Sequence, residues 1–449
     1  MTVSTRWSTD PPAPALPPRA AVAVEALKLA NWLSRTLGRG SGTVAGGRVG
    51  LAIDPTLLTT LAEGRRVALV SGTNGKTTTT RMLVAALSQD GDGDVATNDT
   101  GANMPAGHLA ALADSPLAPV AVLEVDEGYL GRLIEETTPR VVVLLNLSRD
   151  QLDRIAEVRM LADRWRSAMA GLRPAVAGGG TGTVVVANAD DPMVVWAASV
   201  APEVRWVGAG QVWHNDAVAC PSCGGGIGFG PDGGWACDRC RFERPERHAW
   251  LEGPELVTAD GERVHVDIAL PGQFNRANAA MAAMAATLMG ADAAPTVSVS
   301  EAIHDLSDVH QVAGRFSTTL RHGHPVRLLL AKNPAGWAAI FDLLEETGSL
   351  ASPVVLSVNA RVADGLDTSW LWDVPFERLA GRNVVVTGDR RLDLAVRLRY
   401  AEVGCAMVAD PLAALDRAVG LCRAGDVTAP DAVDFLGNYT AFADLRGRL

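Results

Sequence analysis

This 449-residue sequence has very little lysine, no net positive charge and no long apolar run. It contains only Lys28, Lys76 and Lys332, and its formal net charge is −11. An acidic chain offers no basic stripe for a phosphate backbone, which argues against nucleic-acid binding. No run approaches the roughly 18 apolar residues of a membrane span, and no secretory signal opens the chain. We therefore expect a cytoplasmic protein that has no nucleic-acid partner.

Cysteine is also scarce, and four of the six cysteines stand in two C-x₂-C pairs separated by thirteen glycine-rich residues. In a reducing compartment this spacing predicts four thiolates that converge on Zn²⁺ rather than disulfides. Four thiolates leave no open position, so we expect a structural site. The predicted zinc ligands are Cys220, Cys223, Cys237 and Cys240. Cys405 and Cys422 are expected to be buried thiols.

The sequence does contain short apolar runs that alternate with helical patterns. The chain exceeds the roughly 250–300 residues of a single core, so two or three domains are expected. Runs at 66–71, 120–125, 141–147 and 183–187 are predominantly apolar, as strands buried on both faces are. Helical patterns between them predict an α/β fold with a mostly parallel sheet.

Changes in this pattern divide the chain. We expect a leader and helix at 1–45, a large α/β domain at 46–300, and a smaller α/β domain at 312–449. The cysteine-rich stretch 214–250 breaks the alternation with glycine and proline, and therefore indicates an insertion in the large domain.

A glycine-rich turn follows the run at 66–71 and precedes a helical pattern, where backbone N–H groups and a helix N-terminus can bind phosphates. Lys76 would reach the β- and γ-phosphates of ATP, and the Thr77 hydroxyl would bind Mg²⁺. The strict G-x-x-x-x-G-K pattern is not met, because Val70 stands at its first glycine. The candidate ATP-binding residues of this loop are Gly72, Thr73, Asn74, Gly75, Lys76, Thr77 and Thr78.

The string 72–77 resembles the phosphate loop of the Mur ligases and folylpolyglutamate synthetases. This resemblance implies that Glu124, at the end of an apolar run, binds Mg²⁺. It also implies that Asn275 meets adenine and that Arg315 contacts phosphate. Taken singly, Glu124 could be a solvated strand end, and Asn275 and Arg315 could be structural residues.

The sequence departs from that family in three places. Gln151 stands where the family has a metal-binding histidine, and no lysine lies between 77 and 331 to match its carbamylated lysine. The usual ribose-binding aspartate is also missing, and 331–336 occupies its place. Together with 150–154 and 363–373, this segment resembles the MurT family, the synthetase subunits of lipid II isoglutaminyl synthase.

The MurT resemblance implies ATP-dependent amidation at the inner face of the membrane. A carboxylate does not react with ammonia at neutral pH, and conversion to an acyl phosphate removes that obstacle. The substrate would be the D-glutamate α-carboxylate of the lipid II stem peptide, and the product D-isoglutamine. Lys76, Arg315 and Mg²⁺ would neutralise charge on the phosphoryl group.

Neither Cys405 nor Cys422 lies in a glycine-flanked nucleophile elbow, so ammonia would come from elsewhere. The MurT resemblance implies that its source is a separate GatD-like glutaminase subunit. The resemblance also implies that an aspartate of this chain orients the partner's catalytic histidine. We favour Asp367 over Asp364 and Asp373, although Asp367 could instead cap the turn that follows it.

Two other functions fit parts of the sequence. One is a free-standing Mur or folylpolyglutamate-type ligase that joins an amino acid. The other is a P-loop ATPase whose zinc ribbon reads nucleic acid. A ligase would form ADP only with a carboxylate acceptor, whereas a nucleic-acid reader would retard nucleic acid in a gel.

Overall fold

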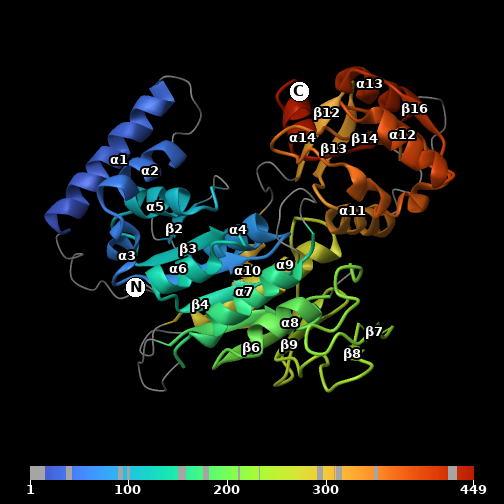
Figure 1. The fold of residues 1–449 in the computed structure, drawn as a ribbon. Coiled ribbons are helices and arrows are strands. Elements are labelled where there is room, and N and C mark those ends of the chain that lie inside the picture. Colours follow the sequence, from blue (N-terminus) through green and yellow to red (C-terminus); the bar gives the residue numbers. More distant parts are fainter. Residues whose placement is uncertain are drawn as a thin grey trace, which may run out of the picture.

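The computed structural model contains two α/β domains and an N-terminal helical layer (Figure 1). It describes residues 16–36, 43–88, 95–98, 102–149, 158–174, 182–210, 213–231, 233–290, 297–307, 309, 316–347, 352–422 and 432–449. Among these, no helix has both the length and the apolar character needed to cross a membrane.

The larger domain is built on a sheet whose described strands have the order β11-β10-β9-β6-β5-β4-β1-β3-β2. The pairs from β2 to β9 are parallel, and β9, β10 and β11 continue the sheet in antiparallel fashion. The mostly parallel α/β fold is thus confirmed. The strands are β1 Arg66–Ser71, β2 Val95–Thr97, β3 Val120–Val125, β4 Val141–Leu144, β5 Val184–Asn188, β6 Val204–Gly208, β9 Ala249–Glu252, β10 Glu255–Thr258 and β11 Arg263–His265.

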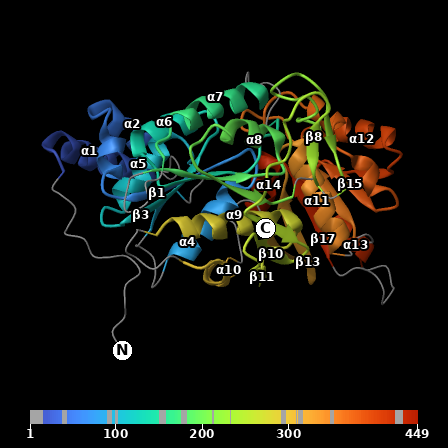
Figure 2. The ribbon, with the colours of Figure 1, turned by 90° about the horizontal axis from the view of Figure 1, so that it is seen from below.

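Helices bury both faces of this sheet, which is why its central strands are predominantly apolar. Along β1, Val67 and Leu69 pack into one core, and Ala68 and Val70 pack into the other. Figure 2 shows α6, α7 and α8 on one side and α4, α9 and α10 on the other. These helices are α4 Lys76–Leu87, α6 Leu130–Thr137, α7 Val158–Ala170, α8 Pro192–Ala198, α9 Gln273–Leu288 and α10 Val299–Leu306.

The N-terminal layer consists of α1 (Pro18–Thr36), α2 (Thr43–Ile53) and α3 (Leu57–Ala62), which lie beside α5 (Pro105–Asp114). Two glycines let α2 approach its neighbours. A Cβ on Gly46 would lie 2.0 Å from Oδ1 of Asn31 on α1, and one on Gly47 would lie 2.0 Å from the Ala106 carbonyl on α5. The α1–α2 pair is therefore closely packed.

The C-terminal domain has its own sheet, with the order β12-β13-β17-β14-β15-β16 among the described strands. All pairs except β12 with β13 are parallel. The elements are β12 Phe316–Arg321, β13 His324–Leu330, α11 Pro334–Glu346, β14 Val354–Ser357, η2 Ser369–Trp372, η3 Phe376–Leu379, β15 Val384–Thr387, α12 Arg391–Tyr400, β16 Cys405–Met407, α13 Pro411–Cys422, β17 Val433–Gly437 and α14 Tyr439–Arg446.

Between β6 and β9 the chain leaves the main sheet, and β7 (Ile227–Phe229) pairs with β8 (Trp235–Cys237) in a small antiparallel sheet. This excursion falls within the predicted insertion 214–250. Of the two remaining cysteines, Cys422 is buried as expected, but Cys405 is only partly buried. Cys405 belongs to β16, which stands last in the strand order and has a neighbour on one side only.

Candidate active site

The glycine-rich turn between β1 and α4 has the geometry that phosphate binding requires. Gly72 and Gly75 have φ angles of 151° and 87°, which residues with a Cβ rarely adopt. A Cβ on Gly75 would also lie 2.4 Å from Oδ1 of Asn278 on α9. Because Lys76 opens α4, the first N–H groups of that helix point toward the loop.

Hydrogen bonds tie this loop to the segment after β4. The Thr73 N–H donates to the Asn146 carbonyl (2.9 Å), and the Thr73 hydroxyl donates to the Ser148 carbonyl (3.0 Å). The Asn74 N–H donates to Oδ1 of Asn146 (2.9 Å), whose amide donates back to the Asn74 carbonyl (3.0 Å). The loop is therefore fixed by neighbours within the protein.

Lys76 is 3% exposed and lies at the centre of the loop. Its Nζ donates to the Gly72 carbonyl (2.5 Å) and lies 3.2 Å from Oε2 of Glu127. The Glu127 side chain is 11% exposed, so the two opposite charges compensate each other in largely buried surroundings. Phosphate oxygens at this position would take over the role that Glu127 plays here. No sequence motif predicted this role for Glu127.

Glu124 and Thr77, the predicted Mg²⁺ ligands, are in contact. The Thr77 hydroxyl donates to Oε2 of Glu124 (2.7 Å), and the Asn103 amide donates to Oε1 (3.4 Å). Glu124 is 2% exposed, so it is not a solvated strand end. Within the described residues, no Lys or Arg side chain pairs with it. A buried carboxylate without a cationic partner fits Mg²⁺, a hard cation that prefers oxygen ligands.

Two side chains behind Glu124 fix its backbone. Asn98 accepts from the Glu124 N–H and donates to the Glu124 carbonyl, both at 2.8 Å. His108 of α5 donates from Nε2 to the same carbonyl (2.7 Å). Burial lowers the pKa of His108 to about 4, so the imidazole is neutral. Sequence reasoning missed both residues, which lie 26 and 16 positions from the glutamate they hold.

Two of the remaining predicted residues, Thr78 and Asn275, lie in the first turns of helices. Thr78 is buried in the first turn of α4. Asn275 is buried in the first turn of α9, and its amide donates to the Pro271 carbonyl (2.7 Å). Arg315 and Gln151 lie outside the described residues.

The C-terminal domain contacts the phosphate loop through Asn333. Asn333 and Asn74 exchange two amide hydrogen bonds, at 3.2 and 3.3 Å. Asn333 also caps α11, where its Oδ1 accepts from the Gly336 N–H at 2.9 Å. The loop therefore lies where the two domains meet.

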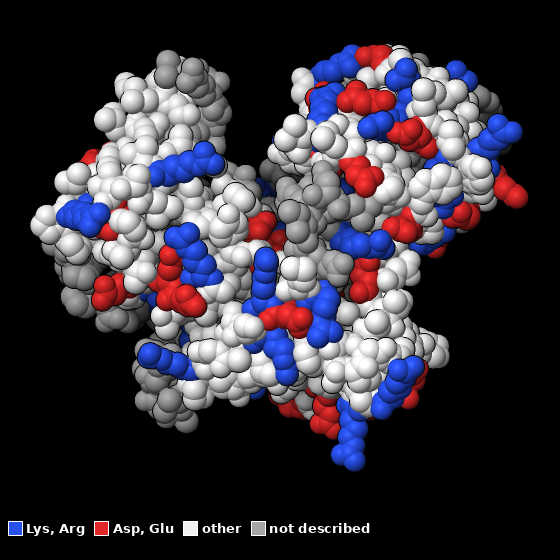
Figure 3. Space-filling model, viewed as in Figure 1, with Lys and Arg blue, Asp and Glu red and all other residues white. Residues whose placement is uncertain are grey.

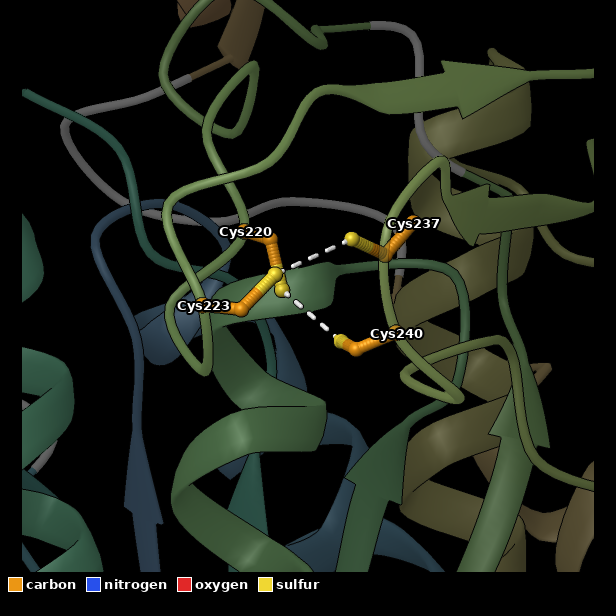
Figure 4. A group of neighbouring side chains, drawn as sticks. All are labelled: Cys220, Cys223, Cys237 and Cys240. Carbon is orange, nitrogen blue, oxygen red and sulfur yellow. Dashed lines mark hydrogen bonds between the residues drawn. The ribbon is translucent and has the colours of Figure 1, made fainter.

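The four paired cysteines converge in the insertion, and Figure 4 shows the two pairs facing each other. Their sulfur atoms all lie within 4.8 Å of one another. The Cys220–Cys240 and Cys223–Cys237 separations are 3.7 and 3.5 Å. Zinc–sulfur bonds of about 2.3 Å place tetrahedral sulfurs about 3.8 Å apart, so the cluster fits zinc. The Arg239 N–H lowers the pKa of Cys237 to about 7, which favours the metal-binding thiolate.

The cysteine insertion is anchored beside β5. The Trp235 indole donates to the Ala189 carbonyl (3.0 Å), and Arg244 lies 3.3 Å from Asp190. The cluster is thus attached to the central domain through β8 and the residues after it.

Family comparisons cover both halves of the molecule. Residues 70–286 match the Mur ligase middle domain, and residues 330–442 match the MurT ligase C-terminal region. The MurT subunit of lipid II isoglutaminyl synthase (glutamine-hydrolyzing) from Staphylococcus aureus (strain COL) is 30% identical over 404 residues. The match covers 85% of this chain and 88% of that protein. This chain belongs to the MurT family.

Membership in the MurT family is what the motifs predicted. The MurT subunit from Streptococcus pneumoniae (strain ATCC BAA-255 / R6) is 31% identical, with 82% of this chain and 83% of that protein covered. MurF from Acinetobacter baumannii shares the fold at 18% identity and a TM-score of 0.59, with 89% of this chain and 80% of that chain covered.

The three aspartates that the MurT resemblance singled out have different surroundings. Asp364 is buried and accepts from the Thr440 N–H (2.9 Å), and Asp373 lies 3.2 Å from Arg149. Asp367 is exposed and accepts from the Ser369 N–H (2.8 Å), which lowers the pKa of its carboxyl. Asp367 therefore does cap the following turn, and it also presents a carboxylate to the surface.

Proposed function

We propose that this chain is the synthetase subunit of a lipid II isoglutaminyl synthase. It amidates the D-glutamate α-carboxylate of the lipid II stem peptide to D-isoglutamine, in the cytoplasm at the inner face of the membrane. MurT family membership carries the proposal. The buried cluster of Lys76, Thr77 and Glu124 supports an ATP-dependent step.

In this proposal ATP converts the unreactive carboxylate into an acyl phosphate, which ammonia can attack. The N–H groups of loop 72–77 bind the phosphates, and Lys76 stabilises charge on the phosphoryl group as it moves. Thr77 and Glu124 hold Mg²⁺. Arg315 supplies a second positive charge and Asn275 binds adenine.

The ammonia comes from a GatD-like glutaminase subunit. A surface stripe on α12 supports a protein partner: Leu392, Val396 and Tyr400 are 62, 51 and 73% exposed at intervals of four residues. The ring of Trp372 lies 5.2 Å from that of Tyr400 and extends the stripe. Such contiguous exposed apolar surface is typical of interfaces. The stripe adjoins η2, which directly follows the turn of Asp367.

The cysteine cluster is proposed to hold a structural Zn²⁺ that stabilises the insertion, since four thiolates leave no site for a reacting water. We also retain the division into segments 1–45, 46–300 and 312–449, although α2 (Thr43–Ile53) crosses the first boundary and packs against α1. Separate hydrophobic cores in the central and C-terminal sheets support the last two as domains.

An assay of the complex with a coexpressed GatD-like subunit tests the function. We expect ADP release that requires both the stem peptide and glutamine or ammonium salt, and a product that carries an amide at the D-glutamate α-carboxyl. ADP release that requires a free amino acid instead would identify a free-standing ligase. Retardation of nucleic acid, without acceptor-dependent ADP release, would favour an ATPase that reads nucleic acid.

A further inference from the structure

The outer side of α1 is apolar although no described element covers it. Its inner side packs Ala23, Leu27 and Asn31 against the protein. On the outer side, Val22, Leu29 and Leu33 follow one another at intervals of seven and four residues, which places them on one helix face. The exposed apolar side chains are Val22 at 61%, Leu29 at 57%, Trp32 at 59% and Leu33 at 45%.

Positive charge surrounds this apolar face. Arg19, Lys28 and Arg35 of α1 are all exposed. The single acidic residue of the helix, Glu25, lies on the same outer face, four residues before Leu29, and is 3.5 Å from Lys28. Residues 16–53 contain five basic residues and one acidic residue, a formal charge of +4. Because the whole chain carries −11, the remainder carries −15.

Figure 3 shows the lobe formed by α1 and α2 as mostly uncharged surface with few charged side chains, whereas acidic and basic residues intermingle over the C-terminal domain. The glycine-mediated contacts of α2 with α1 and α5 hold this lobe in place. An apolar helix face flanked by Lys and Arg, with Trp and Leu exposed, has the chemistry of helices that lie in a membrane interface.

We propose that the outer face of α1 binds the surface of a bilayer rich in acidic phospholipid. Val22, Leu29, Trp32 and Leu33 enter the boundary between headgroups and acyl chains, and the basic residues lie among the phosphates. The acidic remainder of the molecule is repelled by the same surface, so the charge distribution also orients the protein. This inference rests on the proposed function in one respect: a lipid-anchored substrate is reached at the bilayer surface.

Cosedimentation of the full chain with vesicles tests the docking. Vesicles of phosphatidylglycerol mixed with phosphatidylcholine should pellet the protein, and vesicles of pure phosphatidylcholine should not. The double variant Leu29→Glu/Trp32→Glu should lower the partition coefficient on the order of tenfold or more, because it replaces buried apolar area with charge that the lipid repels. Leu320→Glu, at a 70% exposed leucine of β12, is the matched control and should bind like the unaltered chain.

Circular dichroism and ATP hydrolysis in solution establish that the double variant is folded. The inference is overturned if the unaltered chain stays in the supernatant, if the double variant binds equally well, or if Leu320→Glu loses binding to the same degree. A change in the mass of the double variant by light scattering would show that α1 instead contacts a second copy. Amidation of a soluble stem peptide without the lipid tests the proposed function separately, since that reaction needs no bilayer.

Discussion

At the residue scale, the ammonium of Lys76 is held by the loop carbonyl of Gly72 and by Glu127. Lys76→Ala removes the positive charge that would stabilise the phosphoryl group in the transition state of its transfer. ATP turnover should therefore fall on the order of 100-fold or more. The melting temperature should change modestly, because the apolar core of the sheet is untouched. Lys28→Ala, at an exposed lysine, is the control and should retain turnover. Undiminished turnover in Lys76→Ala would remove the nucleotide site from this loop.

His108 makes stability depend on pH. Its folded pKa of about 4 lies below the unfolded value of about 6.5, so the folded protein disfavours the proton that the unfolded chain accepts. The contribution is fully present above pH 6.5 and is lost as the pH falls toward 4, by up to roughly 3 kcal/mol. Urea unfolding from pH 7 to 4 measures the loss. His108→Gln does not titrate and should show a flatter profile. An equally steep profile in that variant would assign the acid sensitivity to other groups.

The sequence predicts the members of the site that belong to one local motif, and it misses the side chains that support them. The candidates Lys76 and Thr77 follow from the spacing of the loop, and the candidate Glu124 follows from the resemblance to the Mur ligases. Asn98 and His108 hold the Glu124 backbone from distant segments, and a tertiary contact of this kind leaves no periodic signal. Asn333 lies in a motif that the sequence singled out, but its bond to Asn74 depends on how two domains meet.

At the scale of elements, strands buried on both faces were predicted best. The runs at 66–71 and 120–125 coincide with β1 and β3, because four and five of their six positions are apolar. The antiparallel extension β9–β11 was not predicted. In β11, Arg263 and His265 are exposed, so the strand has no apolar run that marks it. The N-terminal helices α2 and α3 were also not predicted. Glycine has a low helix propensity, but the glycines of α2 allow close packing against α1 and α5.

The cysteine insertion should depend on its metal. We expect about one zinc per chain by elemental analysis and a lower melting temperature after chelation, because a structural zinc site contributes folding free energy. Cys223→Ser should lose the zinc, and Cys405→Ser, at a cysteine far from the cluster in sequence, should keep it. ATP turnover of protein that stays folded should be affected less than stability. A metal-free preparation of undiminished stability would contradict the structural role.

We expect the exposed apolar stripe of α12 to bind the glutaminase subunit. Val396→Lys places a charge in the middle of the stripe, and it should abolish copurification with the glutaminase subunit while the isolated chain stays folded. Leu320→Lys changes an exposed leucine of β12 and serves as the control. If Val396→Lys copurifies normally, the partner binds another surface.

At the scale of the whole molecule, the two domains and the insertion are linked around the candidate site. Arg149, just after β4, lies 2.5 Å from Asp216 of the insertion and 3.2 Å from Asp373 of the C-terminal domain. Asn74 and Asn333 join the domains at the phosphate loop. Residues of all three parts therefore contact one another around the loop.

In the proposed complex, both subunits contribute residues to the glutaminase site. A cysteine–histidine pair works better when a third group orients the imidazole and supports its positive charge, and Asp367 would supply that group to the glutaminase. Asp367→Asn separates this role from capping, because asparagine accepts the Ser369 N–H as well as aspartate does but carries no charge. In the complex, glutamine hydrolysis should fall on the order of 100-fold or more, while amidation driven by ammonium salt stays within about twofold.

Asp373→Asn is the matched control for this measurement, since it also removes one carboxylate charge, but from a group that pairs with Arg149 of the same chain. It should leave glutamine hydrolysis near the unaltered rate. If Asp367→Asn lowers both activities together, the residue acts by holding the C-terminal domain in shape. If it lowers neither, the carboxylate that completes the partner's site must come from elsewhere, and equal losses in the two variants would point to surface charge rather than to one oriented histidine.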